Sequence, residues 1–195
     1  MGDVLKVRSP KEAAEALRAG GVVLVPTETV VGLVAAERGL DRVREIKGRD
    51  ANKPIALLCR SPEEAFALAD HIPFLARKLA ALFWPGPLTL VLDRPGGGTV
   101  GLRVPADSAV REVLAAFGGP LYATSANLAG EPAPRGLEEV DRRVSDVVDL
   151  TVRGEPGRGE ASAVVDLSAG RVRLLRSTGE LSEKMLARLA VEDER

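Results

Sequence analysis

Apolar residues along the chain follow two patterns, one with helical spacing and one with short consecutive runs. Helical spacing predicts helices over residues 10–19, 40–47, 73–83, 107–116, 137–144 and 181–190, and a further helix that begins at residue 62. Consecutive apolar runs predict strands over residues 22–25, 55–59, 88–92, 100–104, 120–124, 163–166 and 172–175. Because such alternation is typical of a sheet covered by helices, we expect an α/β fold.

Local signals support the start of two helices and mark one long loop. Ser9-Pro10-Lys11-Glu12 and Ser61-Pro62-Glu63-Glu64 each place a serine three residues before a glutamate, with proline at the first helical position. This arrangement is typical of a capping box. Residues 153–159 are rich in glycine and charge, so they form either a mobile lid or a long surface loop.

Composition indicates an ordinary globular protein. Of the 195 residues, 45% are hydrophobic and 28% are charged, which excludes a mainly disordered chain and suits one domain over residues 1–195. The net charge of −1 provides no general attraction for nucleic acid, although 27 Lys and Arg residues could form a local basic surface. With only 3% aromatic residues, stacking platforms for single-stranded nucleic acid are not expected.

The reactive residues are few. One cysteine, Cys59, excludes an intrachain disulfide, and one histidine, His71, excludes a multi-histidine metal site. We expect Cys59 to be a small core residue and His71 to be a structural residue at a helix end. No apolar run approaches 18 residues and the first residues lack the layout of a secretory signal, so a cytoplasmic protein is expected.

Two polar segments near predicted strands are candidates for ligand binding. Residues 26–33 place two threonines and Glu28 just after a strand, where hydroxyls could hold an amino acid or a phosphate; the alternative is a helix N-cap made by Thr27. Residues 47–54 hold Lys47, Arg49 and Lys53, which could bind phosphate oxygens; the alternative is favourable placement of cations at a helix C-terminus.

Two more segments have similar alternatives. Arg103 interrupts an apolar strand, so it either faces inward toward a protein or ligand carboxylate or faces solvent. The segment Thr124-Ser125-Ala126-Asn127 either lines a nucleotide site or forms a plain turn. Because ligands commonly bind at strand ends in open α/β sheets, we expect these segments to meet there.

Taken in order, the segments resemble the motifs of the YrdC-like family of threonylcarbamoyl-AMP synthases. Residues 26–33 match P-T-[DE]-T-x-[YF]-G-L, with Val31 in the aromatic position, where we expect the pocket to differ. The other matches are Lys47, Arg49, Lys53 and Pro54 to a K-x-R motif, residues 84–89 to W-P-G-P-x-T, Arg103 and Pro105 to R-x-P, residues 125–132 to S-A-N-x-S-G-x-P, residues 162–166 to S-T-V-x-D, and Arg176 to the start of R-x-G. The resemblance covers about residues 20–179.

The resemblance implies a single-domain YrdC-like fold of the α/β (α+β) class, with a twisted mixed sheet flanked by helices. It implies that Thr29, Arg103 and Ser162 bind threonine. It further implies that Arg49, Lys53, Thr99, Ser125, Asn127 and Arg176 bind ATP, and that Lys47, Arg49 and Arg103 are catalytic, with no metal held by the protein itself.

The reaction implied is the joining of L-threonine, bicarbonate and ATP into threonylcarbamoyl-AMP and pyrophosphate, with Mg²⁺ on the phosphates. The product would pass to a separate tRNA threonylcarbamoyltransferase complex. Family members have also been regarded as binders of double-stranded RNA, so a noncatalytic RNA- or tRNA-binding module is the alternative function. Related carbamoyl-adenylate chemistry with another substrate is a third possibility, which the absence of zinc-finger-like cysteines disfavours.

Overall fold

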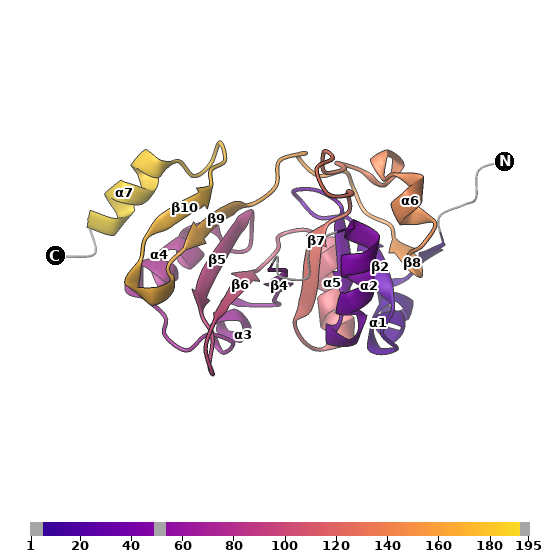
Figure 1. Cartoon of the computed structure of the whole chain (residues 1–195), viewed down its shortest axis with the longest axis horizontal. Coiled ribbons are helices and arrows are strands. Elements are labelled where there is room, and N and C mark those ends of the chain that lie inside the picture. The colour runs from indigo at the N-terminus through magenta and orange to yellow at the C-terminus, as the bar shows by residue number, and fades with distance from the viewer. Residues whose placement is uncertain (1–5, 49–53, 192–195) are drawn as a thin grey trace.

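The computed structural model describes residues 6–48 and 54–191, and their strands form one mixed sheet (Figure 1). The strand order in the sheet is β1-β8-β2-β3-β7-β4-β6-β5-β9-β10. Parallel and antiparallel pairs alternate irregularly, with β2 antiparallel to β3 and β4 parallel to β6. The strands are β1 Val7–Arg8, β2 Val22–Val25, β3 Gly32–Ala35, β4 Ala56–Leu58, β5 Leu88–Asp93, β6 Thr99–Arg103, β7 Leu121–Ser125, β8 Leu150–Val152, β9 Ala163–Asp166 and β10 Arg173–Arg176.

The helices cover the two halves of this sheet separately. In Figure 1, α1, α2, α5 and α6 surround the half built on β2, β3, β7 and β8, whereas α3, α4 and α7 lie on the half built on β5, β6, β9 and β10. The α-helices within the described ranges are α1 Pro10–Arg18, α2 Leu40–Lys47, α3 Pro62–Phe66, α4 Phe74–Phe83, α5 Ser108–Phe117, α6 Arg142–Ser145 and α7 Glu183–Val191. The mixed α/β architecture expected from the alternating pattern is therefore confirmed.

Three hydrophobic clusters fill the space between sheet and helices. Alternate residues of a strand face opposite sides of a sheet, so β2 contributes Val23 to one cluster, which includes residues of α1 and α5, and Leu24 to another, which includes Val43 of α2. The third and largest cluster joins β4, β5, β6 and β9 to α3, α4 and α7. On β5, β6 and β9, only one face of the sheet is packed in this way.

The helix starts follow the capping signals. Ser9 accepts a hydrogen bond from the backbone of Glu12, and the Glu12 carboxylate accepts one from the backbone of Ser9, which confirms the first capping box. At the second, Ser61 caps the helix, but the Glu64 carboxylate binds the backbone nitrogen of Arg60 instead. The second box is therefore only half formed.

Two parts of the predicted secondary structure are wrong. The helix predicted over residues 137–144 is split into a 3-10 turn, Leu137–Glu139, and α6, because Val140 is extended and Asp141 caps the following helix through the backbone of Arg143. The strands β1, β3 and β8 are absent from the prediction. Each has two to four residues and forms only because a neighbouring strand pairs with it.

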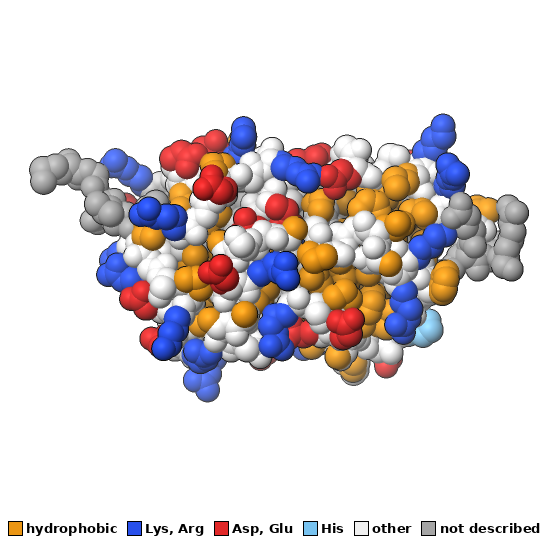
Figure 2. Space-filling view, turned by 180° about the vertical axis from the view of Figure 1, so that it is seen from behind, with side chains coloured by type: hydrophobic (Ala, Val, Ile, Leu, Met, Phe, Trp, Pro, Cys, Tyr) orange, Lys and Arg blue, Asp and Glu red, His pale blue; other side chains and the backbone are white. Residues whose placement is uncertain are grey.

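The remaining reactive residues lie away from any cavity described below. Cys59 is fully buried in the largest cluster, and burial, with the nearby Glu64 carboxylate, raises the pKa of its thiol to about 12, so it is the core residue expected. His71 is exposed in the loop before α4, visible at the edge of the molecule in Figure 2. Among the described helices, the longest reach 10 residues, and none has the length and hydropathy that crossing a membrane requires.

The packing of β6 generates a direct test of this fold. Leu102 is fully buried in the largest cluster, whereas Leu175 on β10 is 53% exposed. Leu102→Ala is expected to lower the free energy of unfolding by about 2–5 kcal/mol, because it leaves a cavity. Leu175→Ala should change it by less than about 0.5 kcal/mol. Urea denaturation of both variants measures the difference, and equal effects would contradict the assigned faces of the sheet.

Candidate functional site: a polar cavity on the open face of the sheet

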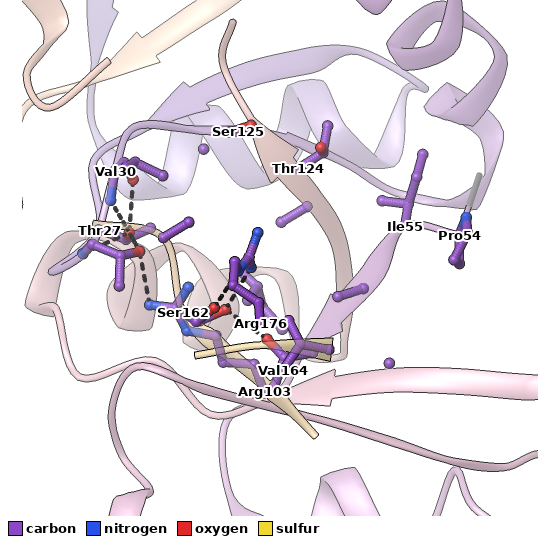
Figure 3. A pocket seen from close by; sticks show the side chains of 18 of the residues that line it. Thr27, Val30, Pro54, Ile55, Arg103, Thr124, Ser125, Ser162, Val164 and Arg176 are labelled. Carbon is purple, nitrogen blue, oxygen red and sulfur yellow. Dashed lines mark hydrogen bonds between the residues drawn. The ribbon is translucent and has the colours of Figure 1, made fainter. Parts of the chain in front are cut away.

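A cavity of about 340 Å³ lies on the face of β5, β6 and β9 that the helices leave open (Figure 3). Its floor is built from residues two apart on the same strands, such as Thr99, Gly101 and Arg103 of β6. The full lining consists of Thr27, Thr29, Val30, Gly32, Pro54, Ile55, Ala56, Leu58, Thr89, Val91, Thr99, Gly101, Arg103, Ala123, Thr124, Ser125, Ala161, Ser162, Val164 and Arg176.

Small side chains account for the empty space. Ala56, Gly101 and Ala123 stand on this face where the opposite face carries leucine and tyrosine. A Cβ atom on Gly101 would lie 3.4 Å from the Cβ of Ala56. The surface of β4 and β6 is therefore covered here only by very small side chains. The lining includes residues at strand ends, such as Ser125 and Arg176, and the cavity extends from there over the face of the central strands.

A tight bend between β2 and β3 forms one wall. The Thr27 hydroxyl donates to the carbonyl of Val30 (2.7 Å) and accepts from the backbone nitrogens of Thr29 (3.2 Å) and Val30 (3.3 Å). Hydroxyls commonly close such local turns. No helix follows, since Gly32 already begins β3, so the helix-cap alternative for Thr27 is wrong. The bend aligns the hydroxyls of Thr27 and Thr29, which lie 2.8 Å apart.

Arg103 is the central cation of the cavity, and only 8% of it is exposed. Its Nη2 donates to Oε1 of Glu28 (2.6 Å) and to the Thr29 hydroxyl (3.1 Å), while Nε donates to the carbonyl of Gly86 (3.2 Å). That carbonyl belongs to the Trp84-Pro85-Gly86-Pro87 turn, which thus helps to hold the guanidinium. The solvent-facing alternative for Arg103 is wrong.

Glu28 is the partner that the buried guanidinium requires. Burial alone would raise the pKa of Glu28, but the charge and hydrogen bond of Arg103, together with backbone hydrogen bonds, lower the pKa below its usual value. Its second carboxylate oxygen accepts from the backbone nitrogen of Asp107 (3.3 Å). Glu28 is not among the predicted site residues. Two signals could have identified it: the acidic position in its motif, and the need of an inward Arg103 for a carboxylate.

A second hydroxyl pair faces the bend from the other side. The hydroxyls of Thr89 and Ser162 are 2.9 Å apart and both residues are buried. Arg176 donates from Nε to the carbonyl of Ser162 (2.6 Å) and from Nη2 to its hydroxyl (3.3 Å), as Figure 3 shows. Burial, and then the charge of Arg103, lower the pKa of Arg176. Two positive groups thus act on the same small volume.

The predicted site residues separate into three groups. Thr29, Thr99, Arg103, Ser125, Ser162 and Arg176 line the cavity. Lys47 and Asn127 are absent from the lining and lie behind it. Arg49 and Lys53 lie outside the described residues, although Pro54, the next residue in the chain, lines the cavity.

Lys47 holds the loop that follows β7. Its ammonium group donates to the carbonyl of Ser125 (2.7 Å) and to the backbone and side-chain oxygens of Asn127 (2.5 and 2.9 Å), and the residue is 5% exposed. Asn127 in turn donates to the carbonyls of Leu128 and Glu131. Lys47 lies in the last turn of α2, as the helix C-terminus alternative has it, and its ammonium group also connects this helix to the loop after β7.

The loop over residues 153–161 packs against the Thr27–Thr29 bend. The backbone nitrogens of Arg158 and Gly159 donate to the carbonyls of Glu28 (3.0 Å) and Thr29 (2.8 Å). Gly157 lies so close that a Cβ atom there would collide with the carbonyl oxygen of Thr29. The Arg158 side chain pairs with Glu180, which connects this loop to the segment after β10. The loop therefore supports the bend from outside.

Val31 does not form a wall of the cavity. It is fully buried in the cluster beneath α2 and α6, and its backbone nitrogen donates to the carbonyl of Pro134. The Val31 side chain therefore belongs to the core and not to the lining of this cavity. The described residues also contain no group of three or more metal-binding side chains.

The fold and site together define an α/β protein with a cavity lined by two arginines and several hydroxyl groups. The family model Sua5/YciO/YrdC, described as "Telomere recombination", matches residues 15–178. The chain belongs to this family.

Named relatives agree with this assignment. The threonylcarbamoyl-AMP synthase of Pyrococcus abyssi is 35% identical over 92% of this chain, and the chain spans 57% of that protein's length. A putative threonylcarbamoyl-AMP synthase of Mycobacterium tuberculosis is 32% identical, with 92% of this chain and 88% of the relative covered. The crystal structure of P. abyssi Sua5 complexed with L-threonine matches with a TM-score of 0.85 and 33% identity over 96% of this chain and 61% of that one.

The Glu28–Arg103 pair makes stability depend on pH. Because the pKa of Glu28 is lowered in the folded state, its carboxylate stabilises the fold above its usual pKa, and this stabilisation is lost as pH falls through the lowered value. Glu28→Gln should lower the free energy of unfolding by about 1–3 kcal/mol near pH 7, and by less as the pH approaches about 3. Denaturation across this range measures it. Glu15→Gln, at an exposed position of α1, is the control. An unchanged stability for Glu28→Gln near pH 7 would refute the pairing.

Close packing predicts that position 157 tolerates only glycine. Gly157→Ala should lower the free energy of unfolding by about 1–3 kcal/mol, because the added methyl group displaces the loop from the carbonyls of Thr27 and Thr29. Gly179→Ala is the matched control, since a Cβ atom added there would meet no other atom within 4 Å. Thermal unfolding compares the two. Equal melting temperatures would show that the loop does not contact the bend closely.

Proposed function

We propose that this chain is a threonylcarbamoyl-AMP synthase, a nucleotidyltransferase that joins L-threonine, bicarbonate and ATP into threonylcarbamoyl-AMP and pyrophosphate. The observation that supports it most strongly is the buried Arg103, held beside Thr29 in a cavity lined by small residues. The relatives named above as synthases, and the likeness to a Sua5 structure complexed with L-threonine, support the choice of substrate.

In this proposal Arg103 binds the carboxylate of threonine. Its Nη1 makes no hydrogen bond with the described part of the chain, whereas Nε and Nη2 are both used to fix the group. A guanidinium fixed on one side can present its remaining donors to a carboxylate. The hydroxyls of Thr29 and Ser162, on opposite walls, are proposed to contact the rest of the amino acid.

ATP is proposed to lie beside threonine, over β6 and β7. Thr99, Ser125 and Arg176 line that part of the cavity and supply two hydroxyls and a cation. Lys47 and Asn127 would act by holding the Ser125 loop in position rather than by touching the nucleotide. Arg49 and Lys53 are proposed to bind the phosphates, which the position of Pro54 in the lining supports.

The proposed chemistry needs positioned cations more than an acid and a base. The amine of threonine combines with bicarbonate to give a carbamate and water. A carbamate oxygen then attacks the α-phosphorus of ATP, the bond to the β-phosphate oxygen breaks, and pyrophosphate leaves. Negative charge develops on phosphate oxygens, which Arg103, Arg176 and the two cations of residues 49–53 would stabilise.

Magnesium would enter with the substrate in this proposal. Mg²⁺ is commonly held by substrate phosphates with few protein ligands, and the described residues offer no cluster of three metal-binding side chains. The reaction is proposed to take place in the cytoplasm. The product would pass to a separate enzyme that transfers the threonylcarbamoyl group to tRNA.

Pyrophosphate release tests the proposal. The protein incubated with ATP, bicarbonate and Mg²⁺ should release pyrophosphate only when L-threonine is present, because the carbamate of threonine is the attacking group. Release that is independent of threonine, or absent in its presence, would refute the assigned reaction.

Arg103→Ala, measured in the same assay, tests the role of Arg103 in binding threonine. Loss of a charge-assisted contact should raise the KM for threonine by about 10- to 100-fold, and should raise the KM for ATP much less. Arg111→Ala removes the same charge from an exposed position of α5 and should leave both constants unchanged. The folded state of both variants is checked by thermal unfolding. A folded Arg103→Ala variant with an unchanged KM for threonine would contradict the role given to Arg103.

A further inference from the structure

A second cavity, of about 460 Å³, lies away from the first and shares no lining residue with it. Leu57 and Tyr122 line this cavity, whereas their chain neighbours Ala56 and Ala123 line the first. Because alternate strand residues face opposite sides, Leu57 and Tyr122 face away from the first cavity. Gly32 lines the first cavity and Ala36, just past the other end of β3, lines the second, so the two cavities lie toward opposite ends of this strand.

Three arginines from separate parts of the chain line this second cavity. Arg18 ends α1, Arg38 lies in the 3-10 turn Glu37–Gly39, and Arg94 follows β5 at the tip of the β5–β6 hairpin, at the lower edge of Figure 1. The carboxylate among the lining residues is that of Glu37, so the cavity has an excess of positive charge. The chain as a whole has a net charge of −1, which makes this local excess distinctive.

Two of these guanidinium groups form no polar interaction within the described part of the chain. Neither Arg38 nor Arg94 forms a side-chain hydrogen bond or ion pair with the residues described. Arg18, by contrast, is fixed: it donates to the carbonyls of Ala116 (2.5 Å) and Phe117 (3.1 Å) at the end of α5. The cavity thus combines one anchored cation with two that remain available to an anion.

Aromatic rings complete the lining. Phe117 and Tyr122 both face the cavity, and the Arg18 guanidinium lies 5.6 Å from the centroid of the Phe117 ring. The Tyr122 hydroxyl forms no hydrogen bond within the described ranges, so it can donate to a ligand. Arginines that bind phosphate, next to rings that stack on a planar group, are the combination that recognises a nucleotide.

We propose that this second cavity binds a nucleotide, with Arg38 and Arg94 on its phosphate and Phe117 and Tyr122 against its base. The volume falls within the range of small-molecule sites. This site is independent of the proposed synthase reaction, because it shares no lining residue with the first cavity and contains none of the residues assigned to that reaction.

Photolabelling with 8-azido-AMP, followed by peptide mapping, tests the site in the full-length protein. Label is expected on the peptide that contains Phe117 and Tyr122. The double variant R38A/R94A should reduce that label at least tenfold, because the phosphate loses both free cations. The control R111A/R142A removes the same charge from exposed positions of α5 and α6 and should leave it unchanged. Arg103→Ala should also leave it unchanged, which separates this site from the first cavity.

Competition by unlabelled compounds against the photolabel identifies the ligand class and tests the proposal. Unlabelled AMP should protect the Phe117–Tyr122 peptide at lower concentration than adenosine or inorganic phosphate, since only AMP uses both the cations and the rings. Equal protection by phosphate and AMP would overturn the nucleotide assignment. Label confined to peptides of the first cavity, or label at Phe117–Tyr122 that R38A/R94A does not reduce, would overturn the site itself. If the Phe117–Tyr122 peptide is labelled but no peptide of the first cavity is, the result would count against the proposed synthase and would leave this site standing.

Discussion

The burial of Arg103 is the constraint on which the cavity depends. A guanidinium that is 8% exposed is stable in a protein only if a carboxylate and other acceptors replace its water. Glu28 provides the charge, Thr29 a hydroxyl and Gly86 a carbonyl. These three partners come from two segments, so pairing with Arg103 fixes the bend after β2 and the turn before β5 relative to β6. The loop over residues 153–161 then binds the outer side of the same bend.

The central strands serve two purposes because their two faces differ. On β5, β6 and β9, one face carries large residues such as Leu90 and Leu102, which join the strands to the helices beneath them. The other face carries threonine, glycine and valine besides Arg103, and these side chains leave an open volume above the strands. Hydrophobic side chains also gather on the outside of this half of the molecule, on the side shown in Figure 2. Because alternate strand residues face opposite sides, the packed core and the cavity lie on opposite faces of these strands.

Local sequence patterns predict most of the helices and the long strands, and motif resemblance identifies six of the residues that line the cavity. What the sequence cannot provide is contact between distant segments. Lys47 is predicted to face phosphates, but its ammonium group binds carbonyl oxygens some 80 residues further along the chain. The motif marks Glu28 as an acidic position, but its pairing with Arg103 joins residues 75 positions apart and is seen only in the folded chain. Short strands such as β3 escape prediction because pairing, rather than propensity, forms them.

A crystal structure with L-threonine and a nonhydrolysable ATP analogue would show directly how Arg103 meets the substrate. We expect the carboxylate of threonine to lie within hydrogen-bonding distance of Arg103, between Thr29 and Ser162, with the α-phosphate beside it and the Glu28–Arg103 pair intact. Threonine bound with its carboxylate away from Arg103, or bound outside this cavity, would contradict it.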